Sequence, residues 1–398
     1  MVIRIHKVLS SCEGESMQRP VMIVVGTRPE GIKMLPVYFS LKSAGIPVFL
    51  CSTGQHNELL QEVFDLFNVV PDLRLSLMKP GQDLSYVTCA VLEAMKRVYQ
   101  EHKPSLVLVQ GDTTTVMAAA LAAFYEKIPV GHIEAGLRTG DKYSPYPEEA
   151  NREIVGLLAE YHFAPTSLAV GNLLAEGKPR EKVFCIGNTV VDALRIVEGK
   201  IKKGEAAVRP AVRDALVLAQ TRHQKKILVT AHRRESFPDG IARIIKVVKS
   251  YAQAHSDCAF FYPYHPNPVV VAAVKEAQLE KEKNVFLFSP LSYHELVFIL
   301  DASDCVMTDS GGIQEEAVSL GKDVLVLREK SERMEGVWEG LATIVGTQEE
   351  TIMQALNRIL GGNVKQSPVR TSVYGDGYSA DRVARVIKVM QATQVAQK

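Results

Sequence analysis

The residues best suited to catalysis stand in one dense polar stretch, 132–152, in the first half of the chain. It holds four carboxylates, two arginines and two prolines, more than a solvated loop needs. Carboxylates that converge in a cleft can keep unequal pKa values, so that one acts as an acid and another as a base. We therefore interpret this stretch, which includes Glu134, Glu148 and Arg152, as a site of acid–base chemistry.

Other polar residues of the first half follow apolar runs directly. Arg28 and Lys33 stand at the start of a helical segment, where they would meet an anion at the helix N-terminus or remain solvated beside a capped turn. Asp112 opens an alanine-rich segment and is either a reactive carboxylate or a helix N-cap. Gln55 and His56 fit an exposed polar loop as well as they fit a ligand contact.

Two histidines of the second half also follow apolar runs. His232 precedes two arginines, whose guanidinium groups suit diphosphate oxygens and favour a neutral imidazole if they lie close. His265 lies in a loop stiffened by three prolines at 263–268, where it is either presented to a ligand or satisfied inside the core.

The segment 308–317 carries the clearest binding signal of the second half. An apolar run ends there, and small residues lead into a helix. Ser310, Gly311 and Gly312 allow a phosphate to approach free backbone N–H groups at the positive end of that helix. Glu316, about one turn further on, can accept hydrogen bonds from ribose hydroxyls. A plain turn would need only one of the glycines, so we predict a nucleotide-phosphate site.

The elements that must position these residues follow an alternating pattern of short β-branched runs and helix-length segments. This pattern is typical of β-α-β units, and it predicts an α/β protein with two doubly wound parallel sheets. In such sheets ligands bind at the carboxyl ends of strands, where the polar turns stand. The predicted strands are 21–25, 47–51, 105–109, 130–133, 162–163 and 183–186, then 226–230, 259–262, 285–288, 305–308, 324–327 and 342–345.

The composition excludes several classes of protein. The 398 residues are 46% hydrophobic and 23% charged, and the net charge of +1 gives no overall field for binding nucleic acid. The longest apolar run, 116–125, is about half of what a membrane span needs, and no signal peptide is apparent, so we expect a cytoplasmic protein without membrane insertion. Six widely spaced cysteines, without zinc-type spacing, predict no metal site.

The segment 198–224 is rich in Lys, Arg and Ala and has little strand signal, so we place a hinge near 190–205, followed by a surface helix. The domains expected from this pattern are an N-terminal extension at 1–19, a first Rossmann-like domain at 20–195, a second at 196–375 and a C-terminal segment at 376–398. Helical spacing at 379–396 predicts a last helix that packs on either half.

In order and spacing, the motifs over residues 20–385 resemble those of the bacterial non-hydrolysing UDP-N-acetylglucosamine 2-epimerases. The motifs are G-T-R-P-E at 26–30, G-Q-H at 54–56, G-D-T at 111–113, H-I-E-A-G-L-R-T-G-D at 132–141, P-E-E-A-N-R at 147–152, H-R-R-E-S at 232–236 and D-S-G-G-I-Q-E-E at 309–316. The resemblance implies a glycosyltransferase-B-type fold with the active site between the domains, a homodimer, and a C-terminal helix that crosses back to the first domain. It also implies reversible interconversion of UDP-GlcNAc and UDP-ManNAc, without a cofactor, for surface polysaccharide synthesis.

The resemblance further implies how the reaction proceeds. UDP leaves C1 while a base removes the C2 proton, which gives 2-acetamidoglucal, and UDP then adds back after protonation on the opposite face. Asp112 and Glu148 would act at C2 as base and acid in an order left open. Glu134 would orient the sugar or share the proton transfer, and His232 would assist the departing diphosphate. The matching positions implied for substrate binding are Arg28, Lys33, Ser310, Gly311 and Arg333 for phosphates and Glu316 for ribose, with Gln55 and His56 for an allosteric UDP-GlcNAc.

Four other functions remain open at this point. A glycosyltransferase of the same fold would share the serine-glycine-glycine signature but needs fewer carboxylates. A hydrolysing epimerase would differ by admitting water, and a silent nucleotide-sugar sensor would not need all the reacting residues. An epimerase of another UDP-N-acetylated sugar would share every motif. Two departures from the family pattern, Ala231 for glycine and Met334 for proline, lie beside proposed site residues.

Overall fold

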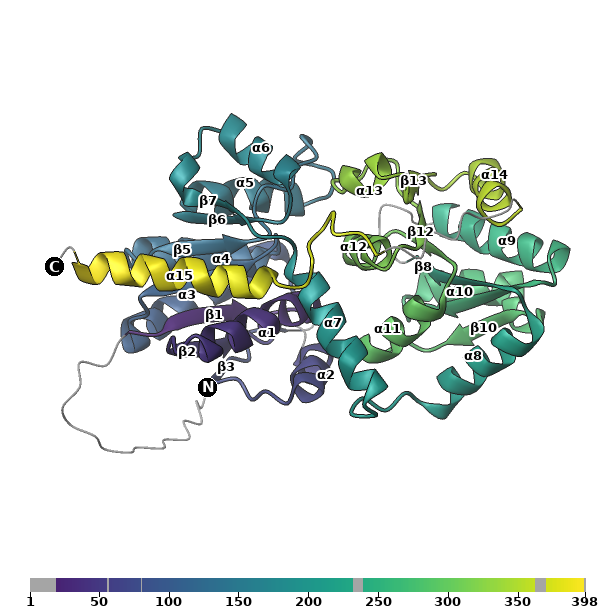
Figure 1. The fold of residues 1–398 in the computed structure, drawn as a ribbon, viewed down its shortest axis with the longest axis horizontal. Coiled ribbons are helices and arrows are strands. Elements are labelled where there is room, and N and C mark those ends of the chain that lie inside the picture. The colour runs from purple at the N-terminus through teal and green to yellow at the C-terminus, as the bar shows by residue number, and fades with distance from the viewer. Residues whose placement is uncertain (1–18, 56, 80, 232–238, 362–369, 397–398) are drawn as a thin grey trace.

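The computed structural model describes residues 19–55, 57–79, 81–231, 239–361 and 370–396. They form two lobes, each built on a parallel sheet (Figure 1). The first sheet contains β1 (Val21–Val25), β2 (Val48–Ser52), β3 (Leu73–Arg74), β4 (Leu106–Gln110), β5 (Val130–Ile133), β6 (Tyr161–Ala164) and β7 (Val183–Cys185). The second contains β8 (Lys225–Thr230), β9 (Cys258–Pro263), β10 (Val285–Phe288), β11 (Cys305–Thr308), β12 (Asp323–Val326) and β13 (Ala342–Ile344).

Helices connect the strands and cover both faces of the sheets. Those of the first lobe are α1 (Arg28–Ser43), α2 (Asn57–Phe67), α3 (Leu84–His102), α4 (Thr114–Tyr125), α5 (Glu148–Leu158), α6 (Ser167–Ala175) and the short η1 (Arg180–Lys182). The remaining helices are α7 (Thr189–Lys202), α8 (Pro210–Arg222), α9 (Asp239–Ala254), α10 (Pro268–Ala277), η3 (Leu279–Lys281), α11 (Tyr293–Ala302), α12 (Gly311–Ser319), α13 (Met334–Trp338), α14 (Glu349–Leu360) and α15 (Ser379–Ala396).

The order of the strands fixes where ligands can bind. The first sheet runs β3-β2-β1-β4-β5-β6-β7 and the second runs β10-β9-β8-β11-β12-β13. Both orders reverse direction at one point, between β1 and β4 in the first sheet and between β8 and β11 in the second. The crevice at such a switch point is the usual ligand site of a doubly wound sheet. The predicted α/β class with two doubly wound sheets is therefore confirmed.

The strand β1 shows why the sequence makes a central strand. Its residues are all buried, and alternate side chains enter different cores, with Ile23 on the α1 side and Met22 on the side of α3 and α4. A strand buried on both faces needs a continuous apolar run rather than alternation, and residues 21–25 provide one. The short strand β3 was missed because its two residues, Leu73 and Arg74, carry no such run.

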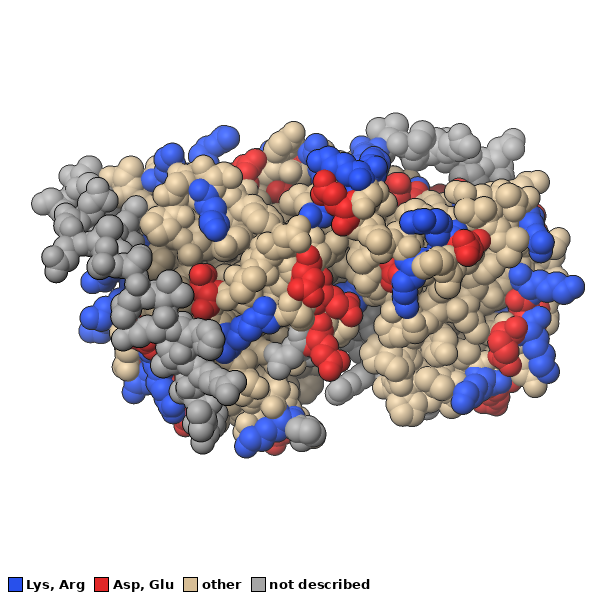
Figure 2. Space-filling model, turned by 90° about the horizontal axis from the view of Figure 1, so that it is seen from below, with Lys and Arg blue, Asp and Glu red and all other residues tan. Residues whose placement is uncertain are grey.

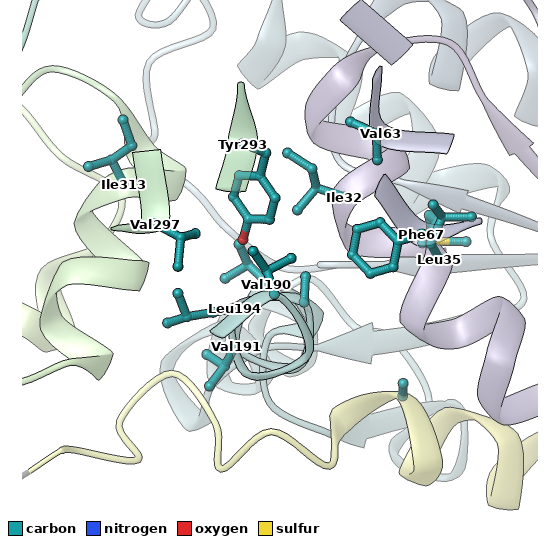
Figure 3. Packing of buried hydrophobic residues seen from close by; sticks show 14 of the residues in the cluster. Ile32, Leu35, Val63, Phe67, Val190, Val191, Leu194, Tyr293, Val297 and Ile313 are labelled. Atoms are coloured by element: carbon teal, nitrogen blue, oxygen red, sulfur yellow. The ribbon is translucent and has the colours of Figure 1, made fainter. Parts of the chain in front are cut away.

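The lobes share a continuous apolar core. Helix α7 occupies most of the segment that we predicted as a hinge, and it contacts α1 on one side and α11 and α12 on the other. Figure 3 shows Val190, Val191 and Leu194 of α7 in one cluster with Tyr293 and Val297 of α11. Because apolar side chains from both lobes are buried together, separating the lobes would expose them to water.

The last helix, α15, returns to the first lobe. It packs against α1 and α7, and Figure 1 shows it lying along that lobe. Val383 and Ile387 are buried there, and Ser40 of α1 donates a hydrogen bond to Asp381 over 2.6 Å. The N–H of Ala380 donates to Asp192 of α7, so α7 also caps the start of this helix.

The surface carries charges of both signs. Figure 2 shows basic and acidic side chains interspersed on the face seen from below, in line with the small net charge of the chain. None of the helices within the described ranges has the length and apolar character that crossing a membrane requires.

Candidate active site

A cavity of about 490 Å³ lies between the lobes, at the switch points of both sheets. Its walls come from the turns after β1, β4 and β5, the first turn of α5, and the segments after β9, β11 and β12. Every described member of the predicted catalytic and substrate-binding sets lines it: Arg28, Lys33, Asp112, Glu134, Glu148, Arg152, His265, Ser310, Gly311, Gly312, Glu316 and Arg333.

Glu134 lines this cavity and is held in place by two cations. Its backbone is in the left-handed region, with φ of 67°, a conformation that costs a non-glycine residue free energy. Both of its carboxylate oxygens accept hydrogen bonds from Lys33, at 2.6 and 2.8 Å, and Arg333 lies 3.2 Å away. Burial alone would raise the pKa of Glu134, but these two cations outweigh burial and hold it below its ordinary value. Glu134 therefore stays a carboxylate.

Asp112 is reached by a cation from α5. Arg152 places its Nη2 atom 2.6 Å from a carboxylate oxygen of Asp112, and Asn151 donates to the backbone carbonyl of Asp112 at 2.8 Å. His132 supports the same turn through a 2.8 Å contact between its Nε2 atom and the carbonyl of Gly111. Burial lowers the pKa of His132 to about 4, so the ring is neutral and its Nε2–H donates. Asp112 thus lines the cavity from a braced turn.

Glu148 reaches the cavity from a different element, as the first residue of α5. Its neighbour Glu149 turns the other way and is fully buried. Glu149 accepts hydrogen bonds from the N–H groups of Thr139 and Gly140 and from Arg152, at 2.8 to 2.9 Å. Of the paired carboxylates in P-E-E, one lines the cavity and the other holds the loop around it.

The second lobe presents a helix terminus to the cavity. Ser310, Gly311 and Gly312 line the cavity where α12 begins, and the first N–H groups of a helix have no partner within it. Glu316, one turn further along, accepts a 2.5 Å hydrogen bond from the Tyr293 hydroxyl. Burial raises the pKa of Glu316 to about 7, although the bond from Tyr293 works against the rise. This wall offers donors for phosphate oxygens and a carboxyl group for hydroxyls.

The two glycines at this terminus differ in what a side chain would meet. A Cβ atom on Gly311 would lie 2.6 Å from the Arg333 guanidinium carbon, whereas a Cβ on Gly312 would meet no atom within 4 Å. Arg333 cannot easily move, because buried Glu134, Glu315 and Glu332 all hold it.

We expect Gly311→Ala to destabilise the protein by about 1–3 kcal/mol, the usual cost of overpacking, and Gly312→Ala to change stability by less than about 0.5 kcal/mol. Urea unfolding of the two variants measures the difference. If the two variants unfolded at the same urea concentration, the Arg333 side chain would be able to shift and make room for the added methyl group.

The phosphate-binding residues predicted on α1 lie close together but have protein partners. Arg28 donates to the carbonyl of Leu291 in the other lobe at 3.0 Å, and burial lowers its pKa. Lys33 bonds Glu134, so in this structure it neutralises a carboxylate. The Nδ1 atom of His265 accepts a hydrogen bond from the N–H of Asn267 over 3.1 Å.

Three of the predicted residues are not found at the cavity: one lies away from it, and two lie outside the residues that the structure describes. Gln55 does not line the cavity, and its amide oxygen accepts a hydrogen bond from Thr115. His56 and His232 lie outside the described residues. Met334, which replaces the family's proline, begins α13, and the neighbouring Arg333 keeps its carboxylate partners.

The sequence analysis gave no individual role to two buried carboxylates of the second lobe, Glu332, which lines the cavity, and Glu315. Glu332 contacts Arg152 and Arg333, and Glu315 contacts Arg333 and Lys33. Burial raises the pKa of Glu315 to about 7, against the two cations. Glu315 stood in a quoted motif, but only the fold places it against α1. Over the parts of the chain that the structure describes, no three acidic, histidine or cysteine side chains group as a metal site.

Comparison with known proteins agrees with this geometry. A family model described as UDP-N-acetylglucosamine 2-epimerase matches residues 40–388. A UDP-N-acetylglucosamine 2-epimerase of Yersinia pestis is 44% identical over 381 residues, covering 94% of this chain and 99% of the relative.

Solved structures are similar over the same length. The UDP-GlcNAc 2-epimerase of Neisseria meningitidis, bound to UDP-GlcNAc, has a TM-score of 0.85 at 40% identity and covers 92% of this chain and 99% of its own. The enzyme of Methanocaldococcus jannaschii, in complex with UDP-GlcNAc and UDP, has a TM-score of 0.79 at 31% identity, with coverage of 93% and 99%. These likenesses confirm the predicted glycosyltransferase-B-type architecture. The chain belongs to the UDP-N-acetylglucosamine 2-epimerase family, whose members are isomerases.

Proposed function

We propose that the protein interconverts UDP-GlcNAc and UDP-ManNAc by inverting C2 of the sugar. The C2 proton is not next to a carbonyl group, so its direct removal would leave an unstabilised carbanion. Elimination avoids this problem: a base takes the C2 proton, the C1–O bond breaks, and UDP leaves with the bonding electrons, giving 2-acetamidoglucal. Protonation of C2 on the opposite face and return of UDP to C1 complete the inversion.

The observation that carries this proposal is the convergence of three carboxylates on one cavity. Asp112 and Glu148 line the cavity from different elements, an arrangement that suits two groups acting on opposite faces of one carbon. Glu134 is held ionised by Lys33 and Arg333, so in our proposal it orients the sugar through its hydroxyls and does not donate a proton.

The leaving group has its own wall in this proposal. The start of α12, with Ser310 and Gly311, binds the diphosphate, and Glu316 binds the ribose. His232 assists the departing diphosphate as expected from its motif, although it lies outside the described residues. Relatives bound to UDP-GlcNAc and UDP support this choice of substrate. We place the activity in the cytoplasm, as a source of precursors for surface polysaccharides.

The test is proton NMR of the purified protein with UDP-GlcNAc in D2O, without added metal or NAD. We expect deuterium at C2 together with a growing UDP-ManNAc anomeric signal. Release of free sugar and UDP would indicate a hydrolysing enzyme instead. An unchanged spectrum would exclude UDP-GlcNAc as the substrate and direct the same experiment to related UDP-sugars.

We also propose that the protein is a homodimer that associates through α4 and α5. These two helices pack together, yet they leave large apolar side chains exposed: Phe124, Tyr125, Ile154 and Leu157, the last with 76% of its surface accessible. Burial of such a patch against a second copy would stabilise association. Light scattering should give twice the chain mass for the wild type and the single mass for Leu157→Glu. A monomeric wild type at micromolar concentration would refute the dimer.

A further inference from the structure

Glu332 lies in the second lobe, between β12 and α13, with 3% of its surface exposed. Three arginines meet its carboxylate. Arg328 is 3.1 Å away, Arg333 contacts it directly, and Arg152 of the first lobe reaches it over 3.2 Å. Burial disfavours a charged carboxyl group, but the arginines outweigh it and keep the pKa of Glu332 far below its usual value. Glu332 is therefore a buried anion that receives a cation from across the cleft.

Arg152 links Glu332 to Asp112, the carboxylate proposed to act at C2. The same Nη2 atom that approaches Glu332 lies 2.6 Å from Asp112, while Nη1 lies 2.9 Å from Glu149. A guanidinium group is planar and rigid, so its orientation is set by the partners on both of its edges. Glu149 belongs to the same helix as Arg152, whereas Glu332 is the contact that comes from the opposite lobe.

We propose that Glu332 is a positioning residue that, through Arg152, holds the carboxylate of Asp112 in its reactive orientation. Because Glu332 and Asp112 belong to different lobes, this orientation is complete only when the lobes are together. The inference rests on the proposed function, since the part played by Asp112 at C2 is itself proposed. Glu332 lines the cavity, but in this proposal it acts through Arg152 and not on the reacting atoms.

The test compares Glu332→Gln with Glu335→Gln. Glu335 also joins the lobes, by accepting a hydrogen bond from Thr166, but it does not contact Arg152 and does not line the cavity. We expect Glu332→Gln to lower kcat about 10- to 100-fold, as misplacement of a reacting group does, with KM and the Kd for UDP changed less than about threefold. Glu335→Gln should retain the wild-type kcat. Unchanged UDP binding also establishes that the variant is folded.

A double variant separates positioning from a general structural effect. If Glu332 acts through Asp112, then Asp112→Asn with Glu332→Gln should keep the residual rate of Asp112→Asn alone. If the double variant were slower than Asp112→Asn by the same factor that Glu332→Gln costs alone, the proposal would be overturned. A Glu332→Gln variant that lost only UDP affinity would overturn it as well.

A crystal structure of Glu332→Gln with UDP tests the same point without turnover. Arg152 should have left Asp112, and an unmoved Arg152 would refute the positioning role whatever the substrate is. Failure of the proposed function would appear differently, as a wild-type protein that exchanges no C2 proton.

Discussion

Asp112→Asn is expected to slow the epimerisation of UDP-GlcNAc by about 10²- to 10⁴-fold, the range that a positioned acid or base contributes. The amide has nearly the shape of the carboxylate, and Asn151 still donates to the backbone carbonyl of residue 112 over 2.8 Å, so the cavity should keep its form. It cannot take a proton from C2. The rate of deuterium incorporation, followed by NMR, measures the loss, and calorimetry should show UDP binding within a few-fold of wild type.

The matched control is Glu153→Gln, the same chemical change one residue after Arg152. Glu153 is exposed on α5 and does not line the cavity, so we expect wild-type turnover. If both variants were equally slow, the loss would follow from removing any carboxylate near Arg152 and not from proton transfer by Asp112. If Asp112→Asn kept full activity, Glu148 and Glu134 would have to carry the chemistry between them.

Arg333→Met is expected to give the largest loss of stability, about 3–5 kcal/mol at pH 7. Arg333 is buried among Glu134, Glu315 and Glu332, and removing one partner of a buried ion pair leaves uncompensated charge. Urea unfolding measures the change. Arg370→Met is the control, since Arg370 pairs with Glu198 but is about half exposed, and exposed pairs contribute about 1 kcal/mol or less.

The same variant has a predictable pH dependence. In the wild type, the pKa values of Glu134 and Glu332 are held low by cations, so the stability these groups contribute is present above their unfolded values and lost as pH falls through the folded ones. Without Arg333 their pKa values rise, and protonation then stabilises the folded variant. The difference in free energy of unfolding between wild type and Arg333→Met should therefore become smaller as the pH is lowered from 8 to 5. If this difference did not change with pH, the substitution would destabilise the protein by lost packing and not by lost charge.

The turns that bear the candidate site could be predicted from sequence because each follows an apolar run. In a parallel sheet such turns gather at one edge, which is why Asp112, Glu134 and Ser310 line one cavity. Such turns can be predicted from local sequence alone, without knowing how the two lobes pack together.

The contacts across the cleft could not be predicted in that way. Glu332 lies 180 residues from Arg152, and no periodicity or motif links them. Lys33 was expected at a phosphate, but its nearest partner is Glu134, 101 residues away, a pairing that only the packing of α1 against the end of β5 creates. The strand β3 was missed for a different reason, because two residues are too few to form a pattern.

The return of α15 to the first lobe bears on how the protein forms during synthesis. Val383 and Ile387 cover the apolar surface between α1 and α7, yet they are made after the whole second lobe. During synthesis, this surface of the first lobe therefore stays exposed to water until some 200 further residues have been made. At ordinary translation rates this takes about 10–40 seconds. Chaperones that recognise exposed apolar surface have that interval in which to act.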